Sequence, residues 1–442
     1  MMHRESFTAT IRRASTVLML MLLALALVTG YWQTVQSSTL SDREDNPRLV
    51  LAERRISRGA IQDRNGQPLA VSQGTPDGYA RYYPERSAAP VVGYYSLRHG
   101  LGGAEAAFDN ELRGIAGRTR LDTFFDGLLH RVPKGRSVRL TLDLSVQRAA
   151  DAALGDRVGA VVVLSVPEGQ VIALASRPTY DPATLDQDWE QLRSDRASPL
   201  VNRATQGTYQ PGAAFQTVIL AEALSEGRAY LTSTVEANAS VQLGSAAMGC
   251  ATTPPTSTLS AAYAAGCPAP FASLADQLDR DHLTASILRW QLDAGLDGFE
   301  LPAHTTGWSP GGLTTTQAVR ELVLGQGSLT VSPLQMATVI GTLANGGHKL
   351  ASPHLTFEPN STSPTPSLIP PEVASALQAA LPTSADLAGQ TALAVSGENR
   401  LAWFLGFAPA SSPRWAIVVL IENGDAATSQ SVATIVRTRL SP

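Results

Sequence analysis

The segment Tyr209–Thr217 has the form of a tight turn that opens a helix. Pro211-Gly212 interrupts what precedes it, and the apolar spacing of Val218–Leu224 is typical of a helix. The first turn of a helix has N–H groups without partners and a partial positive charge, so it is a natural place for a nucleophile. At the positions in this turn where a reactive side chain could stand, the chain has Ala213 and Gln216, and neither residue supplies a nucleophile.

Few other residues supply groups for catalysis or metal binding. The chain has two lysines, Lys134 and Lys349, so a mechanism that needs a catalytic lysine has two candidates. The seven histidines lack HExxH spacing and the two cysteines lack CxxC spacing, so we expect no metal site. No motif implies a cofactor. A net charge of −4 without a long basic tract argues against nucleic-acid binding.

Residues 14–32 form an uncharged apolar run that is long enough to cross a bilayer, and Tyr31-Trp32 suits an interfacial anchor. Arg4, Arg12 and Arg13 precede it, which predicts a cytoplasmic tail (residues 1–13), a single transmembrane anchor and an extracytoplasmic remainder. The alternative is a signal peptide cleaved near Val28-Thr29-Gly30, which would also place the remainder outside the cytoplasm.

Cys250 and Cys267 belong to this extracytoplasmic part. A disulfide between them is reasonable there, because such compartments are oxidising. The alternative is two free, buried thiols.

After the anchor, a small β-rich module is expected over residues 33–133. Two short apolar runs flank Asn65-Gly66, which is the strongest short-range signal of a β-hairpin. The Gly-rich, polar spacing that continues to about residue 133 shows little helical periodicity.

Residues 134–442 are expected to form an α+β domain. The pattern predicts a strand over 138–143 that runs into Asp143 as a helix cap, a hairpin of 159–164 and 170–175, strands at 401–406 and 415–421, a closing helix at 429–440, and a surface loop at 352–371. Strands at both ends with helices between them imply an antiparallel sheet that is assembled from both ends and packed by helices.

These segments resemble the class B penicillin-binding proteins, the membrane-anchored D,D-transpeptidases that cross-link peptidoglycan. The resemblance covers nearly the whole chain, and its landmarks come in the family's order: residues 58–70, 139–182, 202–204, 209–215, 324–327, 331–337, 344–347 and 402–409. It implies a transpeptidase-like (penicillin-binding) domain over 134–442, after a dimerisation-like module over 33–133.

Three motifs carry the chemistry of that family. A serine at a helix start attacks a D-Ala-D-Ala peptide, and a lysine one turn later, on the same face, takes its proton. A Ser-x-Asn motif relays the proton and orients the substrate amide. A Lys-Thr-Gly motif on an edge strand binds the substrate carboxylate, and its glycine lets the substrate backbone approach.

The chain departs from the family at each motif. Matched residue by residue, the nucleophile and lysine positions are Ala213 and Gln216, the Ser-x-Asn positions are Gly266 and Pro268, and the third motif reads Gln390, Thr391 and Ala392. A methyl group cannot attack a carbonyl, and a glutamine amide cannot act as a base near neutral pH. Neither lysine of the chain has a serine three residues before it.

The resemblance therefore implies a membrane protein of peptidoglycan synthesis, in division or in elongation, that is a catalytically inactive transpeptidase homologue and serves as a structural or regulatory partner. The family's usual associate is a polytopic glycan polymerase that contacts the anchor and the N-terminal module. One alternative is an active enzyme that uses Thr217, Ser257 or Ser260 in the same cleft. Another is a module that binds the peptidoglycan stem peptide through Gln390 and Thr391 without cleaving it.

Overall fold

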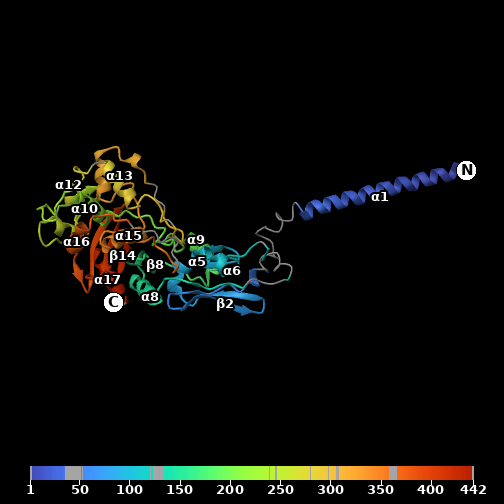
Figure 1. Ribbon diagram of the computed structural model, residues 1–442, viewed down its shortest axis with the longest axis horizontal. Coiled ribbons are helices and arrows are strands. Elements are labelled where there is room, and N and C mark those ends of the chain that lie inside the picture. Colours follow the sequence, from blue (N-terminus) through green and yellow to red (C-terminus); the bar gives the residue numbers. More distant parts are fainter. Residues whose placement is uncertain are drawn as a thin grey trace.

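The structure is a computed structural model that describes residues 2–34, 51, 53–119, 121–122, 129, 134–237, 239–243, 246–278, 280–296, 298–304, 308–357 and 366–440. Helix α1 (Met2–Thr34) is long and separate in Figure 1. Its segment Ala9–Gln33 is apolar and long enough to cross a membrane, and none of it is buried. Among the described residues it is the one such candidate, and it fits a single-pass membrane protein.

The N-terminal module, defined here as residues 53–139, is built on a four-stranded sheet of order β3-β2-β1-β6. Its strands are β1 (Ile61–Gln62), β2 (Pro68–Thr75), β3 (Gly78–Tyr82) and β6 (Val138–Arg139). The hairpin at Asn65-Gly66 is confirmed: β1 and β2 are antiparallel, and the amide of Gly66 donates to the carbonyl of Asp63 at 3.0 Å.

The rest of the module is more helical than its glycine spacing indicates. It contains η1 (Arg86–Ala88), α4 (Ala89–Val92), β4 (Tyr94–Ser96), β5 (Gly100–Gly102), α5 (Gly103–Ala107) and α6 (Asp109–Arg113). A buried ion cluster holds these pieces together. Glu105 accepts from Arg58 at 2.9 Å and from Arg81 at 2.5 Å, and Arg58 also pairs with Asp109 at 2.6 Å. A buried carboxylate needs such partners to stay charged.

The second unit is organised around a six-stranded antiparallel sheet of order β11-β12-β13-β14-β7-β8. Its strands are β7 (Gly159–Ser165), β8 (Val171–Arg177), β11 (Thr383–Ser384), β12 (Leu387–Ser396), β13 (Asn399–Ala408) and β14 (Trp415–Glu422). The expected assembly from both ends of the domain is confirmed, because β14 pairs directly with β7.

Helices cover both faces of this sheet. The side chains of Val161 and Val163 pack in one cluster with α8 (Leu144–Leu154) and α17 (Ala426–Arg437), which lie close together in Figure 1. The alternate residues Val162 and Leu164 pack in the other cluster with α15 (Pro333–Ala344). Because successive strand residues point to opposite faces, an all-apolar strand indicates a sheet that is buried on both sides.

Asp143 caps α8 as expected, accepting the amide of Ser145 at 2.9 Å. The strand before it differs from the expectation. It ends at Arg139 and pairs in parallel with β1, so it belongs to the sheet of the N-terminal module, and Leu140 forms only an isolated bridge with Thr356. The apolar pattern of 138–143 gives a strand but does not identify its partner.

The regular elements between β8 and β11 are mostly helices, joined by long irregular stretches. It contains α9 (Leu185–Ser194), η2 (Gly212–Phe215), α10 (Gln216–Ser225), the small hairpin β9 (Val241–Leu243) and β10 (Ala246–Met248), α11 (Leu259–Ala264), α12 (Ala269–Leu274), α13 (Arg280–Arg289), η3 (Pro310–Gly312), α14 (Thr316–Val323) and α16 (Pro371–Ala380). The centre of the surface loop expected at 352–371 lies outside the described residues.

Candidate functional site

The turn at Tyr209–Gly212 is tied to the sheet before the helix starts. The hydroxyl of Tyr209 donates to Glu422 at 2.8 Å, and Glu422 also accepts from Arg203 at 2.9 Å. The amide of Gly212 donates to the carbonyl of Gly325 at 2.8 Å. Gly212 has φ +54°, and a Cβ there would lie 2.3 Å from the carbonyl oxygen of Leu393 on β12, so this turn requires glycine. One short 3₁₀ turn then leads into α10.

The positions expected for the nucleophile and its base lie at this helix start and are buried. Ala213 and Gln216 each have 1% of their surface exposed. Gln216 donates from Nε2 to the carbonyl oxygen of Cys267 at 2.9 Å, which joins the first motif to the second.

Gly266 and Pro268, the second-motif positions, lie in the connection between α11 and α12. Gly266 has φ +62°, and Pro268 is the residue that precedes α12. A Cβ at Gly266 would lie 2.5 Å from the carbonyl oxygen of Thr391. The backbone of this connection is therefore in close contact with β12.

The third-motif residues Gln390, Thr391 and Ala392 lie on β12, which pairs along its length with β13 on one side. On the other side, β11 pairs only with Leu387 and Ala388. Further along that edge, the carbonyls of Thr391 and Leu393 face Gly266 and Gly212, as their close approaches show. Carbonyls two residues apart in a strand point to the same edge, so the chain's own backbone occupies this edge.

A hydrogen-bond chain closes the space between the motifs. Gln390 donates from Nε2 to the Oγ1 of Thr217 at 3.2 Å, and the hydroxyls of Thr217 and Tyr263 are 3.0 Å apart. Gln390 and Thr217 are fully buried, and Thr391 is 5% exposed. Burial also raises the pKa of Tyr263, so its hydroxyl stays neutral. We use the name closed junction for Thr217, Tyr263, Gln390 and Thr391, together with Ala213, Gln216 and the backbone of Gly266–Pro268.

The closed junction leaves two amide oxygens without partners. The Oε1 atoms of Gln216 and Gln390 are buried and have no hydrogen-bond partner among the described residues. Each amide thus uses its nitrogen and leaves its oxygen unpaired. An unpaired buried acceptor costs about 1–3 kcal/mol, so neither position is optimised for stability alone.

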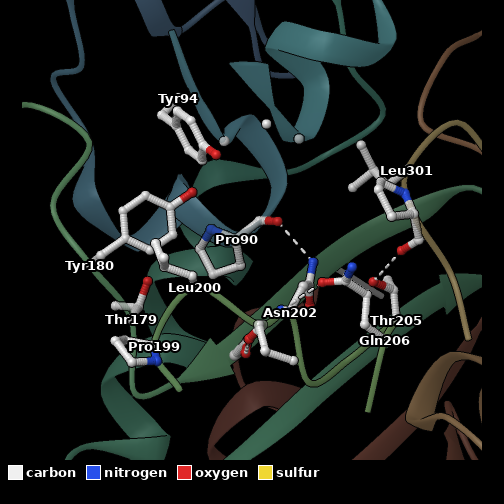
Figure 2. Close-up of a pocket in the computed structure, with 16 residues that line it drawn as sticks. Pro90, Tyr94, Thr179, Tyr180, Pro199, Leu200, Asn202, Thr205, Gln206 and Leu301 are labelled. Carbon is white, nitrogen blue, oxygen red and sulfur yellow. Dashed lines mark hydrogen bonds between the residues drawn. The ribbon is translucent and has the colours of Figure 1, made fainter. Parts of the chain in front are cut away.

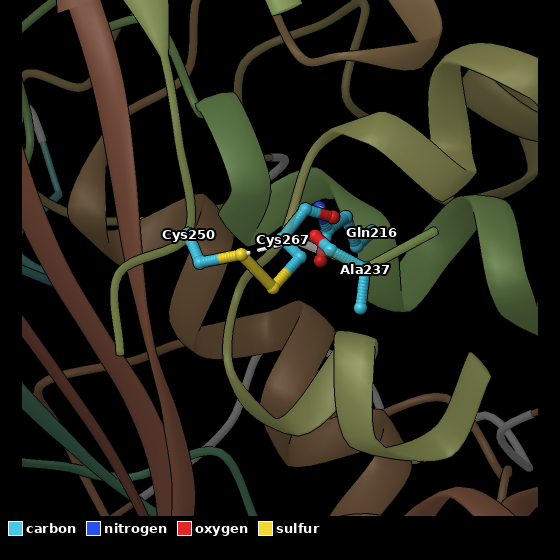
Figure 3. Close-up of a disulfide and its surroundings, with 4 residues drawn as sticks. All are labelled: Gln216, Ala237, Cys250 and Cys267. Atoms are coloured by element: carbon cyan, nitrogen blue, oxygen red, sulfur yellow. Dashed lines mark hydrogen bonds between the residues drawn. A yellow bond between two sulfur atoms is a disulfide. The ribbon is translucent and has the colours of Figure 1, made fainter. Parts of the chain in front are cut away.

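Cys250 and Cys267 form a disulfide in the structure, and Figure 3 shows it beside Gln216. It connects the segment that follows β10 to the second-motif position. The amide of Ala251 supports the same connection by donating to the carbonyl of Ala265 at 3.0 Å. The disulfide therefore holds one wall of the closed junction in place.

The structure brings together the positions that were matched from sequence, but not all the alternative nucleophiles. Thr217 lies in the closed junction, whereas Ser257 is exposed and Ser260 is the second residue of α11, outside the junction's hydrogen bonds. Sequence reasoning missed Tyr263, whose only sequence signal is an aromatic residue within an alanine-rich helix. Among the described residues, no group of three or more His, Cys, Asp or Glu side chains could hold a metal ion.

Comparisons with known proteins agree with this fold. The family model of the penicillin-binding protein transpeptidase domain matches residues 159–441, and that of the penicillin-binding protein A dimerisation domain matches residues 58–138. The peptidoglycan D,D-transpeptidase PbpA of Mycolicibacterium smegmatis is 33% identical, over 93% of this chain and 92% of its own length. PbpA of Mycobacterium tuberculosis is 31% identical, over 94% of each chain.

Solved structures give the same result. Penicillin-binding protein A of Mycobacterium tuberculosis, as its penicillin G acyl-enzyme complex, has a TM-score of 0.76 and 28% identity, and the match covers 87% of this chain and 99% of that one. The D,D-transpeptidase domain of an Eggerthella lenta peptidoglycan glycosyltransferase has a TM-score of 0.75 and 28% identity, covering 87% of this chain and 98% of that one. Two family models match in sequence order, and the relatives match over nearly their full length. The six-stranded sheet agrees with both findings, and this chain belongs to the penicillin-binding proteins of peptidoglycan synthesis.

Proposed function

We propose that this protein is a catalytically inactive transpeptidase homologue that serves as a structural or regulatory partner in peptidoglycan synthesis. One observation carries the proposal. The four positions where the family has its serine, its two lysines and its asparagine hold Ala213, Gln216, Gln390 and Pro268, and all four are buried in the closed junction.

The chemistry supports this proposal. Acyl transfer needs a nucleophile and a base that takes its proton, and loss of either commonly costs several orders of magnitude in rate. Of the three alternative nucleophiles Thr217, Ser257 and Ser260, Thr217 is the one that lies in the closed junction. It is fully buried and bonded to Tyr263 and Gln390, so it has neither access to a substrate nor a base beside it.

The occupied edge of β12 also argues against the alternative that this protein binds the peptidoglycan stem peptide in this cleft. A peptide that adds to a strand edge needs free backbone groups along that edge. Here Gly212 and Gly266 lie against the carbonyls of Leu393 and Thr391. Gln390 and Thr391, the side chains expected to hold a carboxylate, are buried.

We further propose a cytoplasmic N-terminus, a membrane anchor and an extracytoplasmic body, with a polytopic glycan polymerase as the partner that contacts the anchor and the N-terminal module. The exposed apolar segment Ala9–Gln33 supports the anchor. The proposed domains are residues 1–13, 14–32, 33–133 and 134–442. The pairing of β6 with β1 favours a boundary a few residues later, at Arg139.

Labelling with a fluorescent penicillin tests the absence of transpeptidase chemistry. The full chain in detergent should form no covalent adduct, while the similar Mycolicibacterium smegmatis protein, treated in parallel, is the control for reactive label. A stoichiometric, acid-stable label on this chain would overturn the proposal.

Two further measurements test the partner role and its alternative. Co-purification from crosslinked membranes should return an envelope protein, and recovery of none would remove support for a partner. Saturable binding of a pentapeptide stem without turnover would instead favour the binding module. We expect no such binding.

A further inference from the structure

A cavity of about 160 Å³ lies between the N-terminal module and the second unit (Figure 2). Pro90, Tyr94 and the glycines 93, 102 and 103 line it from the N-terminal module. Residues from 176–206, together with Leu301 and Pro302, line it from the second unit. Neither family model separately contains this site, because it forms only where the two matched regions meet.

Hydrogen bonds within its walls fix the shape of the cavity before any ligand binds. Asn202 donates from Nδ2 to the carbonyl oxygen of Pro90 at 2.8 Å, which links the two units directly. Thr205 donates to the carbonyl oxygen of Pro302 at 2.8 Å, and Ser176 accepts the amide of Arg203 at 2.9 Å. A ligand would therefore enter a site whose walls are already held in position.

Two tyrosines form one wall. The rings of Tyr94 and Tyr180 meet edge to face with centroids 6.1 Å apart, and Figure 2 shows both hydroxyl groups pointing toward the same space. Burial raises the pKa of both phenols, which therefore stay neutral and can donate or accept a hydrogen bond. The ring edges and faces provide apolar surface beside these polar atoms.

Thr179 supplies a hydroxyl with no partner. Its side chain is 9% exposed, and its Oγ1 has no hydrogen bond to any residue that the structure describes. In Figure 2 this oxygen points toward Tyr180 and Leu200. Gln206 uses its Oε1 to accept the amide of Asn202 at 3.0 Å. Because this oxygen is itself buried, it lies behind the cavity wall, and the hydroxyls of Tyr94 and Tyr180 are the polar groups that a ligand would meet.

The lining determines the class of that ligand. None of the 16 residues that line the cavity carries a charge, so a carboxylate or an ammonium group would lose its water without gaining an ionic partner. The volume is close to that of a cavity of ~150 Å³ that accommodates one benzene-sized ring, and the cavity is not enclosed, so polar substituents on such a ring can extend toward solvent. Hydroxyl groups and aromatic surface together suit a ring with polar substituents on its rim.

We propose that this cavity binds one uncharged six-membered ring carrying hydroxyl or amide groups, the chemistry of a neutral sugar residue. Such a ligand would contact both units at once and would stabilise their arrangement. The proposal does not depend on the absence of transpeptidase activity, since none of the cavity-lining residues belongs to the closed junction.

Saturation-transfer NMR and calorimetry on the full chain test the proposal, in a detergent without a sugar headgroup. The probe is N-acetylglucosamine, with its cationic analogue glucosamine and the acidic N-acetylmuramic acid as matched compounds. We expect a dissociation constant on the order of 1 mM for the neutral sugar, as suits a single small ring, and binding at least ~10-fold weaker for both charged analogues. No saturable binding of the neutral sugar, or equal binding of all three, would overturn the proposal.

Three variants locate the binding. Tyr180→Phe removes a hydroxyl that points into the cavity and should weaken binding about 5-fold, while the melting temperature of the ligand-free protein stays within about 2 °C of the parent, a combination that a purely structural tyrosine would not give. Leu200→Trp should fill the cavity and abolish binding. Tyr230→Phe, at a residue that is 65% exposed and outside the cavity, should change neither property. Unchanged binding in both Tyr180→Phe and Leu200→Trp would show that the sugar binds elsewhere and would overturn the assignment.

Discussion

Polar groups have opposite environments in the closed junction and in the cavity between the N-terminal module and the second unit. In the closed junction, Gln216 and Gln390 donate to neighbouring groups, and the backbones of Gly212 and Gly266 lie against β12. In the cavity, the hydroxyls of Tyr94 and Tyr180 face a space of about 160 Å³. The segments matched to the family's three motifs thus meet at one point even where their side chains differ from the family's, while an opening is retained elsewhere. The following four experiments test this contrast, from the largest expected effect to the smallest.

Gln216→Lys restores the residue type that the family has at this position. If the junction is closed, this places an unpaired ammonium group in a dry site and should lower the free energy of unfolding by ~3–5 kcal/mol. Urea titration followed by fluorescence measures the change. Gln187→Lys, at an exposed position of α9, is the control and should stay within about 0.5 kcal/mol of the parent. A cost below about 1 kcal/mol for Gln216→Lys would mean that water reaches the junction.

Removal of the disulfide tests how much the Cys250–Cys267 bond stabilises the wall of the closed junction. Cys250 and Cys267 are separated by 17 residues, and closing a loop of that size stabilises a protein by about 3 kcal/mol in the chain-entropy model. The double variant Cys250→Ala/Cys267→Ala should lose about that amount in the same titration. The parent with reductant should match the variant, and the variant itself should not respond to reductant. A reductant effect that persists in the variant would contradict this explanation.

Gly266→Ser restores the serine of the second motif and tests backbone proximity. Gly266 and Gly227 both have positive φ, but a Cβ at Gly266 would lie 2.5 Å from Thr391, whereas a Cβ at Gly227 meets nothing within 4 Å. Gly227→Ser should cost ~1–2 kcal/mol through the left-handed backbone alone. Gly266→Ser should cost about 2 kcal/mol more, because it also overpacks the junction. Equal costs at the two positions would show that the loop and β12 can separate freely.

Thr179→Val tests the cavity side of the contrast by comparison with Thr205→Val. Both threonines are buried, but Thr205 donates to Pro302 and Thr179 has no partner in the described part of the chain. Removing the unpaired hydroxyl should stabilise the ligand-free protein by ~1 kcal/mol, and removing the paired one should destabilise it by a similar amount. Melting curves of the two variants measure the difference. The same sign for both would mean that the Thr179 hydroxyl is bonded to water.

Local patterns in the sequence predicted the frame of the second unit. The apolar runs at 159–164 and 170–175 gave the β7–β8 hairpin, and Asp143 gave the start of α8. Such features depend on neighbours in the chain, which is why they can be read from it. The closing helix begins three residues earlier than expected, because Asp425 caps it by accepting the amide of Thr428.

Contacts between distant segments could not be predicted in the same way. Nothing in the sequence shows that Gly266 touches Thr391, or that Gln390 reaches Thr217, because these contacts depend on how three segments pack. The resemblance predicted which residues occupy the motif positions, but not that these residues are buried against one another. The cavity was missed for the same reason: its walls come from two units, and no sequence pattern shows that these segments meet.

The pairing of β6 with β1 has a mechanical consequence. Strand β6 ends at Arg139 within the sheet of the N-terminal module, and α8 begins at Leu144 on the other unit. Between them, the amide of Arg64 donates to the carbonyl of Leu142 at 2.8 Å, and Asp63 accepts the amide of Leu144 at 3.2 Å. This connection is too short and too strongly bonded to act as a hinge. We therefore expect the N-terminal module and the six-stranded sheet to move together rather than to bend at this connection.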